Sequence, residues 1–158
     1  MTGAAPPPLS AAVLAFLERD GWPVQQTSTQ EAAVVESVFA GSAAEWPVRL
    51  MAYDGYGQLV VESLLPLAPA VPARGALAAL VVGINWQLLT GAFQLDLATG
   101  EVRFRNTLLL VDNEVVTDRL IKGLLYSNVM TVDRCWPALT AVAVDGAEPQ
   151  DVLAALEL

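Results

Sequence analysis

Hydrophobic positions near the start of the chain first recur with helical spacing and then with the spacing of strands. Residues 9–20 repeat apolar side chains every three to four positions, with Ser10 as a candidate cap and Gly21 as the end. Three strand-like runs follow, at residues 33–40, 46–53 and 58–65. The segment Asp54-Gly55-Tyr56-Gly57 between the last two is typical of a tight hairpin turn. These patterns predict a helix followed by an antiparallel meander.

The second half of the chain predicts two more helical segments around one more hairpin. A proline-rich link at residues 66–72 leads into a helix over residues 73–89, and residues 92–111 alternate around a turn at Ala98-Thr99-Gly100. Thr117 is a good cap for a long helix that Pro137 should kink or divide, and a short helix over residues 149–156 follows. The predicted fold class is α+β: about five antiparallel strands flanked by helices, in the order α-β-β-β-α-β-β-α.

Alternation within the strands predicts a sheet that is apolar on both faces. Trp46, Val48 and Leu50 share one face of the second run, while Tyr53 lies on the other. The third run is apolar on both faces except at Glu62 and Ser63. A sheet of this kind needs cover on its second face, which points to an interface.

Composition indicates one small, acidic domain without the usual catalytic groups. The 158 residues are 54% hydrophobic, contain no histidine, and include a single cysteine, Cys135. We expect a disordered tail at residues 1–8 and one domain over residues 9–158. The formal net charge of -9 argues against direct binding of nucleic acid and favours basic protein partners, although acidity also keeps a protein in solution.

The same composition favours a cytoplasmic protein. A lone cysteine cannot form an internal disulfide, and the first thirty residues lack the basic and apolar regions of a signal peptide. The most apolar stretch, residues 76–89, is too short for a membrane span and is interrupted by polar residues. We therefore expect no membrane association.

No residue pattern predicts a catalytic, cofactor or metal site. Asp96 and Glu101 flank a turn and could act as paired carboxylates, but an ion pair of Asp96 with Arg103 and Arg105 is the simpler interpretation. Cys135 lies on an apolar helix face without a histidine to activate it, which favours a packing role. Calcium-binding and phosphate-binding loop motifs are absent from the sequence.

Several segments, in this order and spacing over residues 9–143, resemble the YbjN-like family of bacterial sensory transduction regulators: Glu18-Arg19-Asp20-Gly21-Trp22-Pro23, Glu45-Trp46-Pro47, Leu64-Leu65-Pro66-Leu67, Gly91-Ala92-Phe93-Gln94-Leu95-Asp96, Gly100-Glu101-Val102-Arg103-Phe104-Arg105 and Thr131-Val132-Asp133-Arg134-Cys135-Trp136-Pro137-Ala138-Leu139. The resemblance implies a fold like that of type III secretion chaperones, which are small acidic dimers that hold extended client segments. It supplies no catalytic residues. It therefore favours a non-enzymatic, chaperone-like adaptor that is regulatory or stress-related.

Two surfaces are candidates for a homodimer or partner interface. One is the outer face of the sheet, through Tyr53 and Leu64; the other is the second helix, through the apolar residues Leu77, Leu80, Val81 and Ile84. The alternative function is a sensory domain that binds a small apolar ligand between helix and sheet, near Trp86, Trp136 and Tyr126. An enzyme is the third and least favoured hypothesis.

Overall fold

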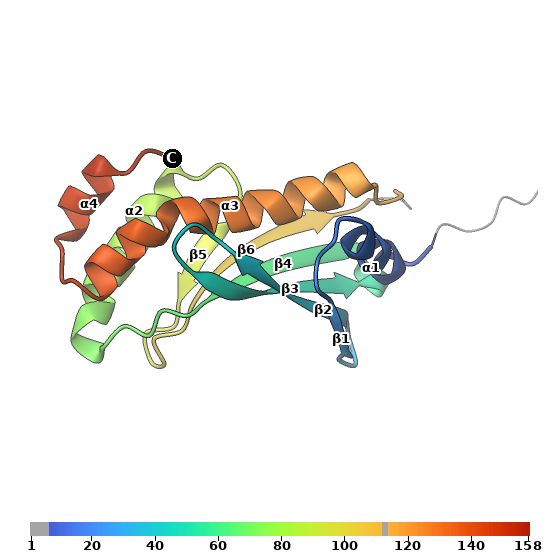
Figure 1. Ribbon diagram of the computed structural model, residues 1–158, viewed down its shortest axis with the longest axis horizontal. Coiled ribbons are helices and arrows are strands. Elements are labelled where there is room, and N and C mark those ends of the chain that lie inside the picture. Colours follow the sequence, from blue (N-terminus) through green and yellow to red (C-terminus); the bar gives the residue numbers. More distant parts are fainter. Residues whose placement is uncertain (1–6, 112–113) are drawn as a thin grey trace, which may run out of the picture.

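The computed structural model describes residues 7–111 and 114–158, so most of the tail predicted at residues 1–8 lies outside the described residues. Four helices and six strands make up the fold (Figure 1). The helices are α1 (Leu9–Arg19), α2 (Arg74–Gln87), α3 (Asp118–Ala143) and α4 (Pro149–Ala155), and the strands are β1 (Gln25–Ser28), β2 (Ala33–Ala40), β3 (Glu45–Tyr53), β4 (Gln58–Leu65), β5 (Ala92–Leu95) and β6 (Val102–Leu109). The α+β class is confirmed.

The six strands form a single antiparallel sheet in the order β1-β2-β3-β4-β6-β5. The predicted meander and hairpin are confirmed, but the prediction of about five strands was one short. Sequence patterns missed β1 because its residues, Gln-Gln-Thr-Ser, are all polar and exposed, so no apolar alternation marks it. The turn between β3 and β4 is a short 3-10 segment closed by Gly57, whose φ of 60° is left-handed.

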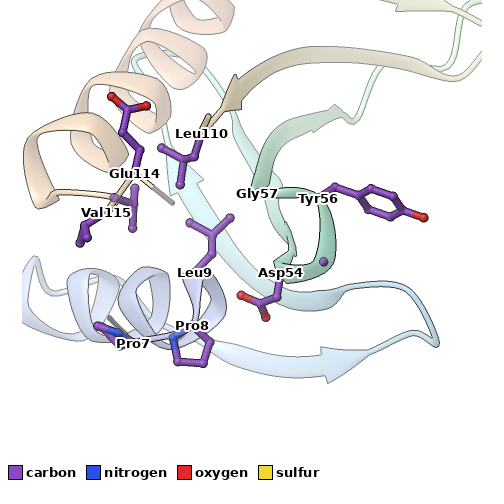
Figure 2. A pocket seen from close by; sticks show the side chains of 11 residues that line it. Pro7, Pro8, Leu9, Asp54, Tyr56, Gly57, Leu110, Glu114 and Val115 are labelled. Carbon is purple, nitrogen blue, oxygen red and sulfur yellow. The ribbon is translucent and has the colours of Figure 1, made fainter. Parts of the chain in front are cut away.

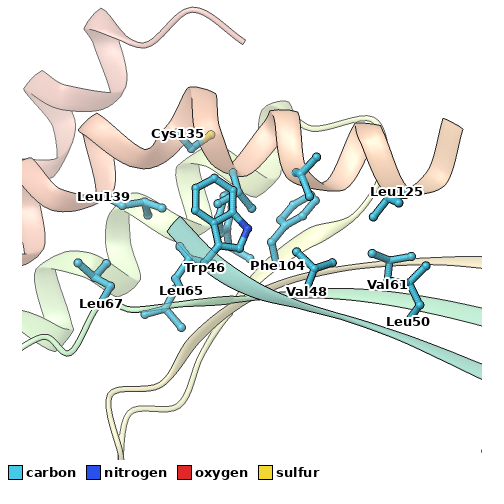
Figure 3. Packing of buried hydrophobic residues seen from close by; sticks show 14 of the residues in the cluster. Trp46, Val48, Leu50, Val61, Leu65, Leu67, Phe104, Leu125, Cys135 and Leu139 are labelled. Atoms are coloured by element: carbon cyan, nitrogen blue, oxygen red, sulfur yellow. The ribbon is translucent and has the colours of Figure 1, made fainter. Parts of the chain in front are cut away.

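The inner face of the sheet carries the hydrophobic core beneath the helices. Trp46, Val48 and Leu50 of β3 are fully buried and point toward α3, as predicted from their alternation (Figure 3). Leu125 of α3 faces Val61 of β4 in the same layer. Removing one such fully buried large side chain costs about 2–5 kcal/mol. The core therefore couples α3 directly to the central strands.

A buried polar network lies inside this apolar layer. The side-chain amide nitrogen of Asn128 lies 2.9–3.2 Å from three oxygen acceptors: the carbonyls of Val61 and Phe104 and the side chain of Asn106. Its amide oxygen accepts a 2.5 Å hydrogen bond from Ser63 Oγ. In the part of the chain that the structure describes, every buried side-chain nitrogen or oxygen has a hydrogen-bond partner. The network thereby fixes the position of α3 on the sheet.

Polar contacts at both ends of α1 fasten this helix to the rest of the fold. Ser10 does not cap the helix as predicted, because its amide and hydroxyl both bond to the carboxylate of Asp54, at 3.2 and 2.7 Å. At the other end, Asp20 accepts hydrogen bonds from Tyr126 Oη at 2.7 Å and Trp22 Nε1 at 3.1 Å. The bond from Tyr126 is the main cause of the lowered pKa of Asp20, and it raises the pKa of Tyr126 in turn.

The long helix α3 begins as the sequence predicted and continues further than expected. The side chain of Thr117 accepts a hydrogen bond from the backbone amide of Leu120, which confirms the predicted cap. The helix then runs without division through Pro137 to Ala143. Its last turns reach α2 and α4, so that one helix spans both ends of the domain.

Candidate partner-binding surfaces

The outer face of the sheet has no helix over it within residues 7–111 and 114–158 (Figure 1). Val60 and Glu62 of β4 are nevertheless buried on this face, with only 7% and 3% of their surfaces exposed. Long side chains of the neighbouring strands close over them. Val38, near the end of β2, remains 42% exposed on the same face. The outer face is therefore a partly apolar surface that no helix of the described residues covers.

A row of alternating charges crosses the middle of the outer face. The strand register aligns Glu36, Arg49, Glu62 and Arg105 on four adjacent strands. Arg49 Nε lies 2.7 Å from Glu36 Oε1, and Arg105 Nε lies 2.6 Å from Glu62 Oε1. Arg103 also approaches Glu62, at 3.5 Å. These pairs correct the expectation that Arg103 and Arg105 would balance Asp96.

The predicted interface residues Tyr53 and Leu64 both lie on the outer face and are half-buried. They are not neighbours. Tyr53 pairs with Gln58, and Leu64 is six residues further along β4, which corresponds to about 20 Å. The outer face thus presents these residues at its two ends, with the row of charges between them.

The residues of α2 predicted to form an interface are core residues instead. Leu77, Leu80 and Ile84 are fully buried and Val81 is 5% exposed, so all four face the sheet of their own chain. The solvent side of α2 and the loop after it carry another apolar stripe: Val82 at 69%, Trp86 at 91% and Leu89 at 100% exposure. The sequence could not separate the two sides, because α2 has no charged residue after Arg74.

The free edge of β5 is closed by a side chain of α2. Asn85 Nδ2 donates to the carbonyl of Phe93 at 2.9 Å, and the amide of Phe93 donates to Asn85 Oδ1 at 2.8 Å. Asn85 therefore occupies the two backbone groups that another strand would use. The opposite edge strand, β1, is polar and exposed along its whole length. The two edges of the sheet are thus unequal.

The candidate reactive residues have structural surroundings. Asp96 accepts hydrogen bonds from the backbone amides of Ala98 and Thr99, which lower its pKa and shape the turn. Burial raises the pKa of Cys135 to about 11, so its thiol stays protonated at neutral pH. No group of three or more potential metal ligands occurs among the residues that the structure describes.

The residues proposed for a ligand between helix and sheet are not brought together. Trp136 stacks on Trp46 with ring centroids 6.1 Å apart, and Tyr126 contacts Trp22 edge to face at 5.9 Å. Trp86 is almost fully exposed. A pocket of about 350 Å³ opens elsewhere, between the start of α1, the β3–β4 turn and the residues before α3 (Figure 2). Of the two carboxylates that line it, Asp54 is already held by Ser10, and Glu114 lies beside Val115.

The architecture has a counterpart among solved structures. The crystal structure of the ExsC–ExsE complex contains a chain that matches with a TM-score of 0.57 and 16% sequence identity, over 83% of this chain and 92% of that chain. At this identity the similarity concerns the fold alone. The fold is like that of type III secretion chaperones, as the sequence resemblance implied.

Sequence comparison gives the family. The model of the YbjN family, described as "Putative bacterial sensory transduction regulator", matches residues 10–141. The chain therefore belongs to the YbjN family. A search of curated proteins gives no match. Among the described residues, no helix is both long and apolar enough to cross a bilayer.

Proposed function

We propose that this chain is a non-catalytic, chaperone-like adaptor that binds a segment of a partner protein. The observation that carries the proposal is the one-sided architecture: among the described residues, α1, α2 and α3 lie on the inner face and α4 packs on α2 and α3, while the outer face keeps the exposed Val38 and the half-buried Leu64. The similar chain in the ExsC–ExsE complex supports this proposal, because that structure is a complex between two proteins.

The net charge of -9 favours basic partners at long range, because opposite charge accelerates encounter in a salt-dependent way. Capture of partners from the native lysate at low and moderate salt tests the proposal. We expect a small set of basic proteins, lost as salt rises. Leu64→Asp should reduce their capture, while Val144→Asp, at an exposed position beyond the end of α3, should not.

Two outcomes would contradict the adaptor proposal. One is that the wild-type protein captures nothing above background; a rise in thermal stability with protein-free metabolite extracts would then favour the sensory alternative. The other is that Leu64→Asp captures the same proteins as the wild type, which would exclude the outer face as their site.

We also propose that the protein is a homodimer through the solvent side of α2. Val82, Trp86 and Leu89 together expose roughly 500 Å² of apolar surface, a large part of the about 800 Å² that each partner buries in a stable interface. The outward residues Gly75 and Ala79 would let two helices approach closely. A helix that is apolar on all sides is normally buried on all sides.

Light scattering during size-exclusion chromatography tests the dimer. Trp86→Ser should weaken it by at least about thirtyfold, the loss typical of an interfacial tryptophan. Because Trp86 is 91% exposed, the variant should keep the wild-type fold. Leu97→Ser, at a 61% exposed turn position, is the matched control and should leave the dimer intact. A monomeric wild type at micromolar concentration would refute this proposal.

A further inference from the structure

A slot lies between the second half of β6 and the helix α3. Strand β5 pairs only with the first half of β6, from Val102 to Arg105, so residues 106–109 have no strand beside them on that side. These residues span about 13 Å. The slot has a volume of about 440 Å³, and its lining includes Thr90 and Gly91, where β5 begins, and Leu120 and Leu124 of α3.

Within residues 7–111 and 114–158, the backbone of β6 has hydrogen-bonding groups in this slot that no neighbouring strand uses. Asn85 binds the amide and carbonyl of Phe93, so these groups point away from β6, and the neighbouring pairs with Arg103 and Arg105 carry the hydrogen bonds between β5 and β6. The alternation continues along the strand. It directs the amide and carbonyl of Thr107 and of Leu109 to the same side, where no strand follows.

The hydrogen bonds on the β4 side of β6 independently give the same direction for these backbone groups. The amide of Leu110 donates to the carbonyl of Gly57, on the β4 side, at 2.8 Å. The backbone amides and carbonyls of every second residue, counted back from Leu110 along β6, therefore point toward β4. The backbone groups of Thr107 and Leu109 have the other parity and point away from β4; Thr107 lines the slot, and Leu109 follows Leu108, the last residue of β6 that lines it. An edge of this kind is a template for an added strand.

The side chains around the slot select what can enter it. Leu108 and Leu124 are half-buried, Leu120 is 41% exposed, and together they give the slot an apolar wall. Gly123 leaves open space on the helix, since a Cβ there would meet nothing within 4 Å. Arg119 is the single charged residue among those that line the slot. Its surroundings therefore suit apolar side chains and a carboxylate.

We infer that the slot binds an extended segment of a partner protein, with apolar residues at alternate positions and an acidic residue beside Arg119. The segment would pair with residues 106–109 as an antiparallel strand in line with β5. This inference rests on the proposed adaptor function and identifies one site and its chemistry. The local preference for an acidic segment differs from the long-range preference of the whole molecule for basic proteins.

A second copy of the chain fits this slot poorly. If two β6 strands paired through residues 106–109, each would continue directly into the place where β5 of the other copy begins. The chain cannot bend away at Leu110, because the amide of Leu110 is bonded to the carbonyl of Gly57 in the β3–β4 hairpin. The helix α3 along the slot would also meet its counterpart. A single strand without flanking structure meets neither obstacle.

A synthetic peptide tests the inference with the full chain. The probe is a fluorescein-labelled peptide of about eight residues in which valine and threonine alternate, and the valine that would lie beside Arg119 is replaced by glutamate. Anisotropy measures its binding, and hydrogen exchange measures the amides of Thr107 and Leu109. We expect saturating peptide to slow exchange of both amides by at least about tenfold. The same peptide with N-methylated alternate residues should have no such effect, because it cannot pair with an edge.

Two variants locate the peptide without disturbing the fold. Leu120→Glu places a glutamate three residues after the cap Thr117, where it favours the helix start, and puts a negative charge in the slot. It should weaken binding by at least about tenfold. Leu97→Glu, the same change at a more exposed position in the β5–β6 turn, should stay within about twofold of the wild type. Thr107→Pro removes only an outward amide and should also weaken binding, whereas Thr107→Val should not.

The inference would be overturned by no change in anisotropy, by unchanged exchange at Thr107 and Leu109, or by equal binding of the peptide to Leu120→Glu and the wild type. Concentration-dependent protection of these amides without peptide would mean that a second copy occupies the slot, which also overturns it. Failure of the adaptor proposal is distinguishable, because that proposal depends on partner capture and on Leu64. If the wild type and Leu120→Glu captured partners equally, the adaptor proposal would stand and the slot would be excluded as the binding site.

Discussion

Replacing Asn128 should show how strongly the buried polar network holds α3 on the sheet. Asn128→Leu keeps a side chain of similar size but removes both the amide donor and the acceptor. It leaves the hydroxyl of Ser63 without its acceptor and the side-chain oxygen of Asn106 without its donor, both in the buried layer. Each unsatisfied group costs about 1–3 kcal/mol. With some gain from the added apolar surface, we expect a net loss of about 2–4 kcal/mol.

Asn128→Asp makes a sharper comparison. The nitrogen is replaced by an oxygen that faces three acceptor oxygens, so the pKa of the new carboxyl should rise on folding. A carboxyl whose pKa is raised by folding lowers the free energy of unfolding most at a pH where the same carboxyl is ionised in the unfolded chain. The aspartate variant should therefore be less stable than Asn128→Leu at pH 7, and the difference should shrink as the pH falls toward about 4, where the carboxyl is protonated.

Urea unfolding followed by tryptophan fluorescence measures both variants, since Trp46 is buried and bonded to Ser63 of the same network. Thr131→Val, which removes a hydroxyl that bonds only within α3, is the control and should change stability by less than about 0.5 kcal/mol. An Asn128→Leu variant as stable as this control would refute the argument. The argument would also be refuted if the difference in stability between Asn128→Asp and Asn128→Leu did not depend on pH.

Two further predictions concern a glycine with positive φ and a hydrogen bond that depends on pH. Gly91→Ala should cost about 1–3 kcal/mol in a thermal melt, because φ is +73° and a Cβ would lie 2.5 Å from the ring of Phe104, whereas Gly55→Ala, with open space, should cost little. Tyr126→Phe should cost about 1 kcal/mol near neutral pH. This difference should vanish in acid, as pH falls through the lowered pKa of Asp20 from its ordinary 3.8, and in base, as pH rises past 10.0 through the raised pKa of Tyr126.

Most of the fold could be predicted from periodicity because most elements have one apolar side. The helices and five of the strands follow this rule. Strand β1 does not, since it is polar and held only by pairing with β2, an interaction that leaves no mark in its own sequence. The hydrogen bonds of Ser10 could not be predicted from local sequence patterns either, because its partner Asp54 is 44 residues away.

The candidate surfaces were predictable only in outline. Alternation correctly placed Tyr53 and Leu64 on the outer face, but their separation depends on the register of β3 and β4. For α2 the apolar periodicity was ambiguous, because Leu80 and Trp86 lie on different sides of a helix with no polar side to orient it. The slot beside β6 depends on where β5 begins, at Ala92 opposite Arg105, and this register is not visible in the sequence.

The position of α3 in the chain has a consequence for synthesis in the cell. The meander of β2, β3 and β4 is complete by Leu65 and α1 already packs on β2 and β3, yet α3, which covers β4 and β6, begins only at Asp118. Once β6 has emerged, residues 118–158 still require roughly 2–8 s at about 5–20 residues per second. During that interval Trp46 lacks its stacking partner Trp136, and Val61 lacks Leu125. The nascent chain thus passes through a stage at which its own core is open to other proteins, and ribosome-associated chaperones have a defined window in which to bind it.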